Sequence, residues 1–188
     1  MARDISDKAD RPSAWLERFA PLIAPGARVL EIAAGNGRNT AFLARLDCRV
    51  TAVDIHPPAE PTAGVTHLTH DLENDAWPFA PHSFDVVVGI NYLWRPRWQA
   101  LCDTLAPGGL FLYETFTEEQ ALWMGRPCNP EHFLKIGELL CLTPPNWRIL
   151  AYEDGRNARD QFVQRIAARS CRLKNLLPVE DVRICVPR

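Results

Sequence analysis

The amino-acid sequence predicts an α/β fold built on a doubly wound, mostly parallel sheet. Short runs of β-branched and small apolar residues alternate with helical patterns, which is typical of parallel strands with helices on both faces. The clearest run, Phe84–Ile90, is almost continuously apolar, as expected of a strand that is buried on both sides. Two further β-rich runs follow one another closely near residue 150, which predicts a terminal antiparallel hairpin and therefore a mixed sheet.

The beginning of the chain follows the order helix, strand, helix, strand. Residues 13–23 carry an apolar stripe with helical spacing, and Pro21 is expected to kink or end that helix. Residues 28–34 form a β-rich run that stops at a glycine. Residues 38–46 return to helical spacing, and residues 48–54 are nearly continuous in small and branched apolar side chains. A second helix and a second strand are therefore expected there.

The alternation continues with one irregularity. Residues 56–64 hold three prolines, which favours a loop over a full crossover helix. Residues 65–69 predict a short third strand, which precedes the strand over Phe84–Ile90. Residues 97–105 are predicted to be helical and to stop at the Pro-Gly-Gly sequence 107–109, and a fifth strand is expected over residues 110–116.

The last elements are one helix and two strands. Apolar residues with helical spacing follow Pro130, although Gly137 weakens the pattern. Residues 147–152 and 161–168 predict two strands, and the polar residues 153–156 predict the turn that makes the pair antiparallel.

Length and composition fit a single domain over residues 1–188. Hydrophobic residues make up 47% of the chain, which excludes disorder as its dominant state. We divide the domain into an N-terminal helical segment (1–27), a cofactor-binding core (28–116), a lid helix with the terminal hairpin (117–170) and a tail (171–188).

The charge balance and the cysteines exclude several classes of protein. A net charge of −2 gives no support for nucleic acid as a partner, and no apolar run is long enough to span a membrane. The six cysteines form no C-x-x-C pair and the histidines do not cluster, so no metal site is expected. A polar N-terminus and reduced thiols favour the cytoplasm. We expect a monomer or a homodimer. From Trp147 onward nine basic residues face five acidic ones, which indicates either a solvated face or an anion-binding patch.

The most informative segment is the glycine turn Gly35-Asn36-Gly37, which lies between a predicted strand and a predicted helix. Glycines are needed where the backbone bends sharply or where a ligand touches the main chain. The free N–H groups at the start of the helix then face that ligand. The same pattern also occurs in ordinary strand–helix turns that bind no ligand. The surrounding residues must therefore show whether this turn binds one.

Two carboxylates provide that context. Asp54 ends the second strand, and Asp71 follows the third. Ligands of open α/β sheets bind beyond the carboxyl ends of the strands, where a carboxylate can accept both hydroxyls of a ribose. The sequence therefore predicts a nucleoside-containing cofactor, although Asp71 has the alternative role of capping a turn.

The residues around the turn favour S-adenosylmethionine over NAD. A dinucleotide site shows G-x-G-x-x-G or -A, whereas this chain has Thr40 at the third small position. Glu31, four residues before Gly35, would repel a pyrophosphate but suits a cationic amino-acid group. S-adenosylmethionine carries a sulfonium and an amino-acid end and no phosphate. An NAD-dependent oxidoreductase remains the alternative.

These motifs, in this order, resemble those of class I S-adenosylmethionine-dependent methyltransferases, which have a Rossmann-like sheet. They are Glu31-x-x-x-Gly35-x-Gly37, Asp54, Asp71-Leu72, Phe84-Asp85-Val-Val and Leu105-Ala-Pro-Gly-Gly109. The resemblance covers residues 28–116, with departures at Ala33-Ala34 and in the short Pro-rich crossover. The segments 126–130 and 134–140 more loosely resemble small bacterial tellurite-resistance-type methyltransferases.

The resemblance implies a role for each part of the motifs. Glu31 and the glycine-turn backbone would hold the methionine portion, Asp54 the ribose and Asp71 the adenine. The residues it assigns to cofactor binding are Glu31, Ala33, Gly35, Asn36, Gly37, Asp54, Ile55, Asp71, Leu72 and Asn91.

The acceptor is expected to be a small molecule that the sequence does not identify. Residues 91–95 would line its pocket or, alternatively, pack against the sheet edge. Methyl transfer needs a general base only for some acceptors, and the catalytic candidates are Tyr92, Glu114 and His132. A non-enzymatic protein that retains the fold is the second alternative.

Overall fold

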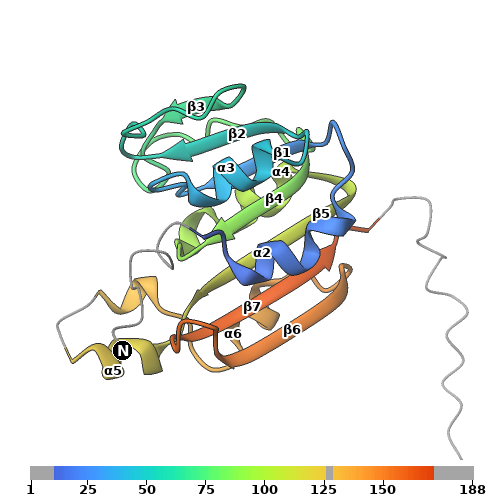
Figure 1. Cartoon of the computed structure of the whole chain (residues 1–188). Helices are drawn as coiled ribbons and strands as arrows, with labels where there is room; N and C mark the ends of the chain where they lie inside the picture. The colour runs from blue at the N-terminus through green and yellow to red at the C-terminus, as the bar shows by residue number, and fades with distance from the viewer. Residues whose placement is uncertain (1–10, 126–128, 172–188) are drawn as a thin grey trace, which may run out of the picture.

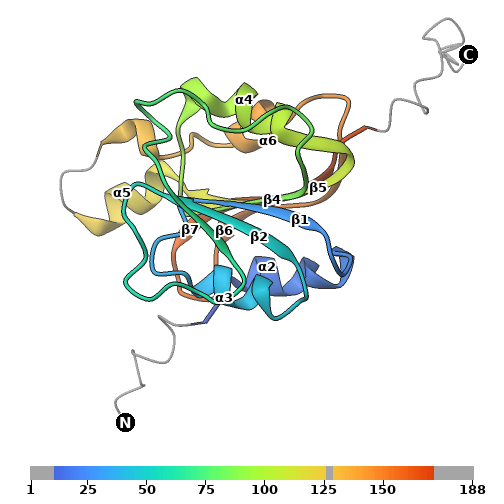
Figure 2. The ribbon, with the colours of Figure 1, turned by 90° about the horizontal axis from the view of Figure 1, so that it is seen from above.

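The computed structural model describes residues 11–125 and 129–171, and these form a sheet with helices on both faces (Figures 1 and 2). The described strands are β1 Arg28–Ile32, β2 Arg49–Asp54, β3 Thr66–Thr69, β4 Phe84–Ile90, β5 Leu105–Phe116, β6 Arg148–Arg156 and β7 Phe162–Arg169. Their order across the sheet is β3-β2-β1-β4-β5-β7-β6. The first five are parallel, and β7 runs antiparallel to both β5 and β6, so the expected mixed sheet is confirmed.

Helices cover the two faces in separate groups. Figure 2 shows α2 and α3 below the sheet and α4 and α6 above it. The described helices are α2 Ala14–Phe19, α3 Arg38–Ala44, α4 Trp98–Thr104, α5 Glu118–Met124 and α6 Glu138–Leu142, with 3-10 turns η1 Ala20–Leu22, η2 Arg95–Arg97 and η3 Pro130–His132. No helix in the described ranges has the length and apolar character needed to cross a bilayer.

Alternate side chains of the central strands fill two hydrophobic cores. In β4, Val87 packs with Trp98 and Phe111 on one face, whereas Val86 and Val88 pack on the other face against the α2 side. The expectation that Phe84–Ile90 is buried on both sides is therefore confirmed.

The N-terminal helix is fixed at both ends by local chemistry. The Ser13 hydroxyl accepts the N–H of Trp15 and caps α2, and Pro21 converts the chain to η1 after Phe19. The indole of Trp15 donates to the carbonyl of Ile166 on β7. The expected end of the α-helix near Pro21 is confirmed.

The start of β5 and the turn before β7 differ from the sequence prediction. Helix α4 ends at Thr104 and β5 begins at Leu105, so the Pro-Gly-Gly sequence at 107–109 lies within the strand, where the pairing with β4 shifts register. In the terminal hairpin, β6 continues through Arg156, and the turn lies at residues 157–161 instead of 153–156. Both errors arose because turn-forming residues also occur at bulges and strand ends.

The segment between β5 and β6 differs most from prediction. The expected helix after Pro130 is wrong, because Leu134 forms a parallel bridge with Thr117 and α6 begins only after Gly137, whose φ is +69°. Helix α5 was not predicted. The side chain of Trp123 on α5 is 61% exposed, so this helix offers no apolar stripe for sequence reasoning to detect.

Close packing between β4 and β5 positions the backbone of Tyr92, one of the catalytic candidates. Gly89 pairs with Tyr113, and a Cβ on Gly89 would overlap the Tyr113 ring. With no side chain there, the ring crosses Gly89, and its hydroxyl donates to the carbonyl of Tyr92 at 2.7 Å.

We therefore expect Gly89→Ala to destabilise the fold by about 1–3 kcal/mol through overpacking, as measured by urea unfolding. The same substitution in a Tyr113→Leu background should cost much less, because the smaller side chain leaves room for the methyl group. An equal cost in both backgrounds would show that the Tyr113 ring is not the constraint.

Candidate functional site

The glycine turn brings the end of β1 directly to the start of α3. Gly35 and Gly37 have φ values of +57° and +78°, in the left-handed region that favours glycine. A Cβ on Gly35 would meet no atom within 4 Å, so the turn faces open space. The backbone is therefore accessible to a ligand at this point.

Glu31 lies buried beneath the turn, with 1% of its surface exposed. The Thr40 hydroxyl donates to Oε2 of Glu31 at 2.5 Å. Burial raises the pKa of Glu31 to about 7, and hydrogen bonds from Thr40 and Asn39 oppose that rise only in part. The group therefore changes charge near neutral pH.

Asp54 lies beside the glycine turn, as the order of the strands predicts. Its Oδ2 accepts the Gly35 N–H at 2.8 Å, and its Oδ1 accepts the His56 N–H at 3.0 Å. The carboxylate thus joins the end of β2 to the turn and also starts the Pro-rich loop.

Asp71 adopts the role of turn cap that the sequence left as an alternative. Its Oδ1 accepts the backbone N–H groups of Glu73 and Asn74, and its Oδ2 accepts the Asn74 side chain at 2.9 Å. These hydrogen bonds, led by that of the Asn74 side chain, lower the pKa of Asp71. The contact with adenine remains a prediction.

A cavity of about 280 Å³, which we call the Asp54 cavity, opens at this edge of the sheet. Its lining includes Ala33, Asp54, Ile55, Asp71, Leu72 and Tyr92. Five of these six residues are among those assigned to the cofactor from the sequence. The sixth, Tyr92, was a catalytic candidate. Its hydroxyl is buried and has no hydrogen-bond partner among the described residues, and burial raises its pKa.

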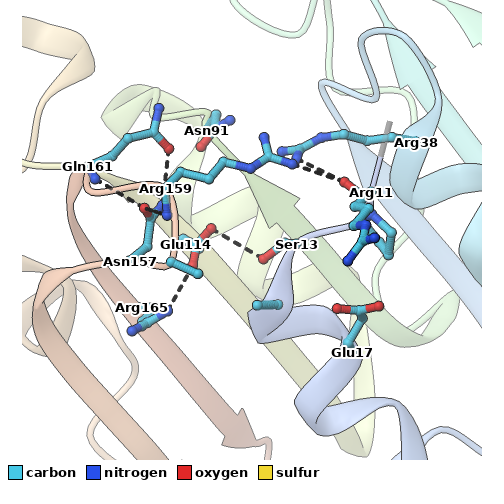
Figure 3. Close-up of a pocket in the computed structure, with 13 residues that line it drawn as sticks. Arg11, Ser13, Glu17, Arg38, Asn91, Glu114, Asn157, Arg159, Gln161 and Arg165 are labelled. Carbon is cyan, nitrogen blue, oxygen red and sulfur yellow. Dashed lines mark hydrogen bonds and ion pairs between the residues drawn. The ribbon is translucent and has the colours of Figure 1, made fainter. Parts of the chain in front are cut away.

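A second cavity, which we call the Glu114 cavity, has a volume of about 210 Å³ (Figure 3). It lies among the segment before α2, the start of α3, the ends of β4 and β5, and the β6–β7 turn. Ser13, Arg38, Asn91, Glu114 and Arg159 come from these five parts of the chain in that order.

Glu114 is the catalytic candidate that the structure places in this cavity. Its Oε1 accepts the Ser13 hydroxyl at 3.2 Å, and Nη1 of Arg165 lies 3.5 Å from Oε2. Burial raises the pKa of Glu114, and the Arg165 charge opposes that shift. Asn91 lies next to it with a φ of +60°, and its N–H donates to the Glu114 carbonyl at 2.8 Å.

The structure separates the other candidates from Glu114. His132 Nδ1 lies 3.2 Å from the carbonyl oxygen of Leu93, and its ring stacks on Trp94. Arg95, at the end of the segment expected to line the acceptor pocket, instead pairs through Nε with Glu138 at 2.6 Å. Only the first residue of that segment, Asn91, lines the Glu114 cavity.

Sequence reasoning missed several residues of the Glu114 cavity. Ser13, Arg38 and Arg159 reach it from positions far apart in the chain. The one available signal was the excess of basic residues after Trp147, to which Arg159 and Arg165 belong. In the described ranges, no three His, Cys, Asp or Glu side chains come together in a way that would hold a metal ion.

Solved structures share this fold at low sequence identity. An S-adenosylmethionine-dependent methyltransferase from Mesorhizobium loti superposes with a TM-score of 0.63 over 83% of this chain and 98% of its own, at 17% identity. The N-methyltransferase NodS from Bradyrhizobium japonicum also superposes with a TM-score of 0.63, over 83% of this chain and 92% of its own, at 18% identity. The [4+2]-cyclase SpnF has the same TM-score of 0.63, over 91% of this chain and 84% of its own, at 14% identity. Because a cyclase shares the fold with methyltransferases, the fold alone does not determine the reaction.

Curated relatives match a shorter part of the chain. Uncharacterized proteins from Mycobacterium bovis and Mycobacterium tuberculosis are 32% identical over 99 residues, which is 46% of this chain and 36% of theirs. The match thus spans about a third of the length of those relatives. The family model described as a methyltransferase domain matches residues 3–162, which is most of the chain. With its sheet order and its glycine turn, this chain therefore belongs to the methyltransferase domain family.

Proposed function

We propose that this protein is an S-adenosylmethionine-dependent methyltransferase that acts on a small molecule. One observation carries the proposal. Residues from three separate segments that the resemblance assigned to the cofactor, represented by Ala33, Asp54 and Asp71, line one cavity beside the glycine turn, together with the catalytic candidate Tyr92. Family membership and the methyltransferases of the same fold support it.

The Asp54 cavity has groups that suit a nucleoside. Each Asp54 oxygen accepts one N–H and keeps a further lone pair, so the carboxylate has capacity for two ribose hydroxyls. Ile55 lines the cavity with 54% of its surface exposed, and Leu72 lies buried nearby. A flat apolar base such as adenine would cover Ile55.

Two features disfavour a dinucleotide cofactor. The dinucleotide-binding fold has strand order 3-2-1-4-5-6, whereas this sheet inserts the antiparallel β7 between β5 and β6. Glu31 lies beneath the turn where a pyrophosphate would sit, and ionising that carboxyl would repel it. An ammonium group at the same place would instead favour the ionised carboxylate.

We assign the methyl donor to the Asp54 cavity and the acceptor to the Glu114 cavity, which are lined by the adjacent residues Tyr92 and Asn91 respectively. When bound, S-adenosylmethionine supplies a methyl group that is open to in-line displacement. The chain then contributes mainly alignment and exclusion of water. For an acceptor that loses a proton, we assign Glu114 as the general base, because it lines the cavity and burial raises its pKa. The size of the Glu114 cavity suits a small acceptor.

S-adenosylhomocysteine is expected to raise the melting temperature of the protein, whereas NAD and NADP are not. A ligand that binds only the folded state adds about 2.7 kcal/mol of stability at a hundredfold excess over its Kd. Thermal unfolding with each compound is the measurement. A shift with NAD and none with S-adenosylhomocysteine would support the oxidoreductase instead.

Asp54→Ala should weaken S-adenosylhomocysteine binding by roughly ten- to several-hundredfold, since bonds to a charged group are worth about 1.5–3 kcal/mol each. Stability should fall by only about 1 kcal/mol, as for a lost cap. Asp54→Asn keeps one acceptor and should lose less affinity. Asp85→Ala is the matched control, because that carboxylate pairs with Arg28 at the other end of the strands. Calorimetric affinity within about threefold of wild type for Asp54→Ala would refute the ribose role.

Glu31 should make the protein less stable as pH rises from about 4.5 to about 7. In this window the folded state holds a proton that the unfolded state has lost, so deprotonation costs up to about 3 kcal/mol. Glu31→Gln should remove this part of the pH dependence of the unfolding free energy, whereas exposed Glu17→Gln should not. The same slope in wild type and Glu31→Gln would place the titration elsewhere.

A further inference from the structure

Arginine side chains from distant parts of the chain face the Glu114 cavity. Arg38 begins α3, Arg159 lies in the β6–β7 turn, and Arg165 lies on β7 (Figure 3). Arg11 adds a fourth. Among the described lining residues the acidic side chains are two glutamates, so positive charge is in excess.

Two of these guanidinium groups meet at one oxygen atom. Nη1 of Arg38 donates to the carbonyl oxygen of Arg11 at 3.2 Å, and Nη2 of Arg159 donates to the same oxygen at 3.1 Å. Figure 3 shows the two side chains reaching this point from opposite sides of the cavity. Burial and the charge of Arg159 both lower the pKa of Arg38. One neutral carbonyl thus receives two like charges that repel each other.

The cavity also has a donor without an acceptor. Nε of Arg165 is buried and makes no hydrogen bond within the described residues, although its Nη groups pair with Glu114 and Glu153. Most buried polar atoms have a partner, so Arg165 brings to this cavity a donor that the described residues do not accept.

We propose that the methyl acceptor carries an oxyanion, which Arg38 and Arg159 bind together in the Glu114 cavity. The proposal rests on the proposed methyltransferase function and adds the substrate class. Planar guanidinium forks match the oxygen spacing of carboxylate and phosphate. Such a group would take the donors that now share the Arg11 carbonyl, and its charge would offset the repulsion between the two arginines.

The test compares benzoate, phenyl phosphate and the neutral isostere benzamide, each titrated by NMR into the full chain saturated with S-adenosylhomocysteine. A titration of S-adenosylhomocysteine alone comes first. If that ligand fails to bind while benzoate binds, the proposed function fails and the oxyanion site stands. With the cofactor product in place, benzoate or phenyl phosphate should bind at least about tenfold tighter than benzamide. Whichever of the two anions binds more tightly shows whether the oxyanion of the acceptor is a carboxylate or a phosphate.

Two variants locate the binding. Arg159→Gln should weaken binding of the preferred anion by about ten- to a hundredfold, as expected for a lost charged hydrogen-bond pair. Its affinity for S-adenosylhomocysteine should stay within about threefold of wild type. Arg156→Gln is the matched control, because Arg156 lies on the same hairpin but pairs with Asp160 outside the cavity. It should leave both affinities unchanged.

Three outcomes would overturn the proposal. In the first, the anions bind no better than benzamide. In the second, Arg159→Gln and Arg156→Gln weaken anion binding equally, which would indicate a general charge effect. In the third, benzoate binds the protein alone but is excluded by S-adenosylhomocysteine, and Arg159→Gln weakens the latter. The arginines would then hold the carboxylate of the cofactor itself.

Discussion

The need to satisfy a buried carboxyl group beneath the glycine turn organises the whole site. An unpaired charge at the position of Glu31 would be costly, so donors must be held against it. Thr40 donates to it from α3, and the neighbouring Asn39 is a further partner. Asn39 also accepts the N–H of Ser13, and the Ser13 hydroxyl donates to Glu114. One run of hydrogen bonds thus connects β1, α3, the cap of α2 and β5, and it fixes the wall of the Glu114 cavity.

Sequence reasoning located the parallel strands well because their patterning and their burial agree. The strand over Phe84–Ile90 has the bounds that its apolar run predicts, since both of its faces are covered. The helix expected after Pro130 was wrong because apolar residues that lie close in sequence belong to different structural elements. Leu134 pairs with a strand end and Leu139 belongs to α6, so their spacing imitates one continuous helix although Gly137 separates them. Helix α5 gave no signal because its large apolar side chains face outward.

The sequence predicted the Asp54 cavity but not the Glu114 cavity with its arginines. The carboxyl-end rule places Asp54 beside Gly35, because neighbouring parallel strands end at the same edge. No comparable rule connects Arg38 with Arg159, whose meeting depends on the path of the β6–β7 hairpin and of the segment before α2. The basic excess after Trp147 was compatible with a solvated face, and only tertiary structure shows which of those arginines turn inward.

The insertion of β7 between β5 and β6 also constrains how the chain is assembled during synthesis. A ribosome delivers β5 and then β6, but the two do not pair with each other. In the described sheet β6 pairs with β7 alone, and β5 needs β7 to cover the edge that faces away from β4. Until residues 162–169 emerge, the long β5 presents an open row of backbone donors and acceptors, which is the kind of edge that recruits other chains. The strand that completes the central sheet is thus the last one delivered in the described chain, and productive folding competes with aggregation throughout that interval.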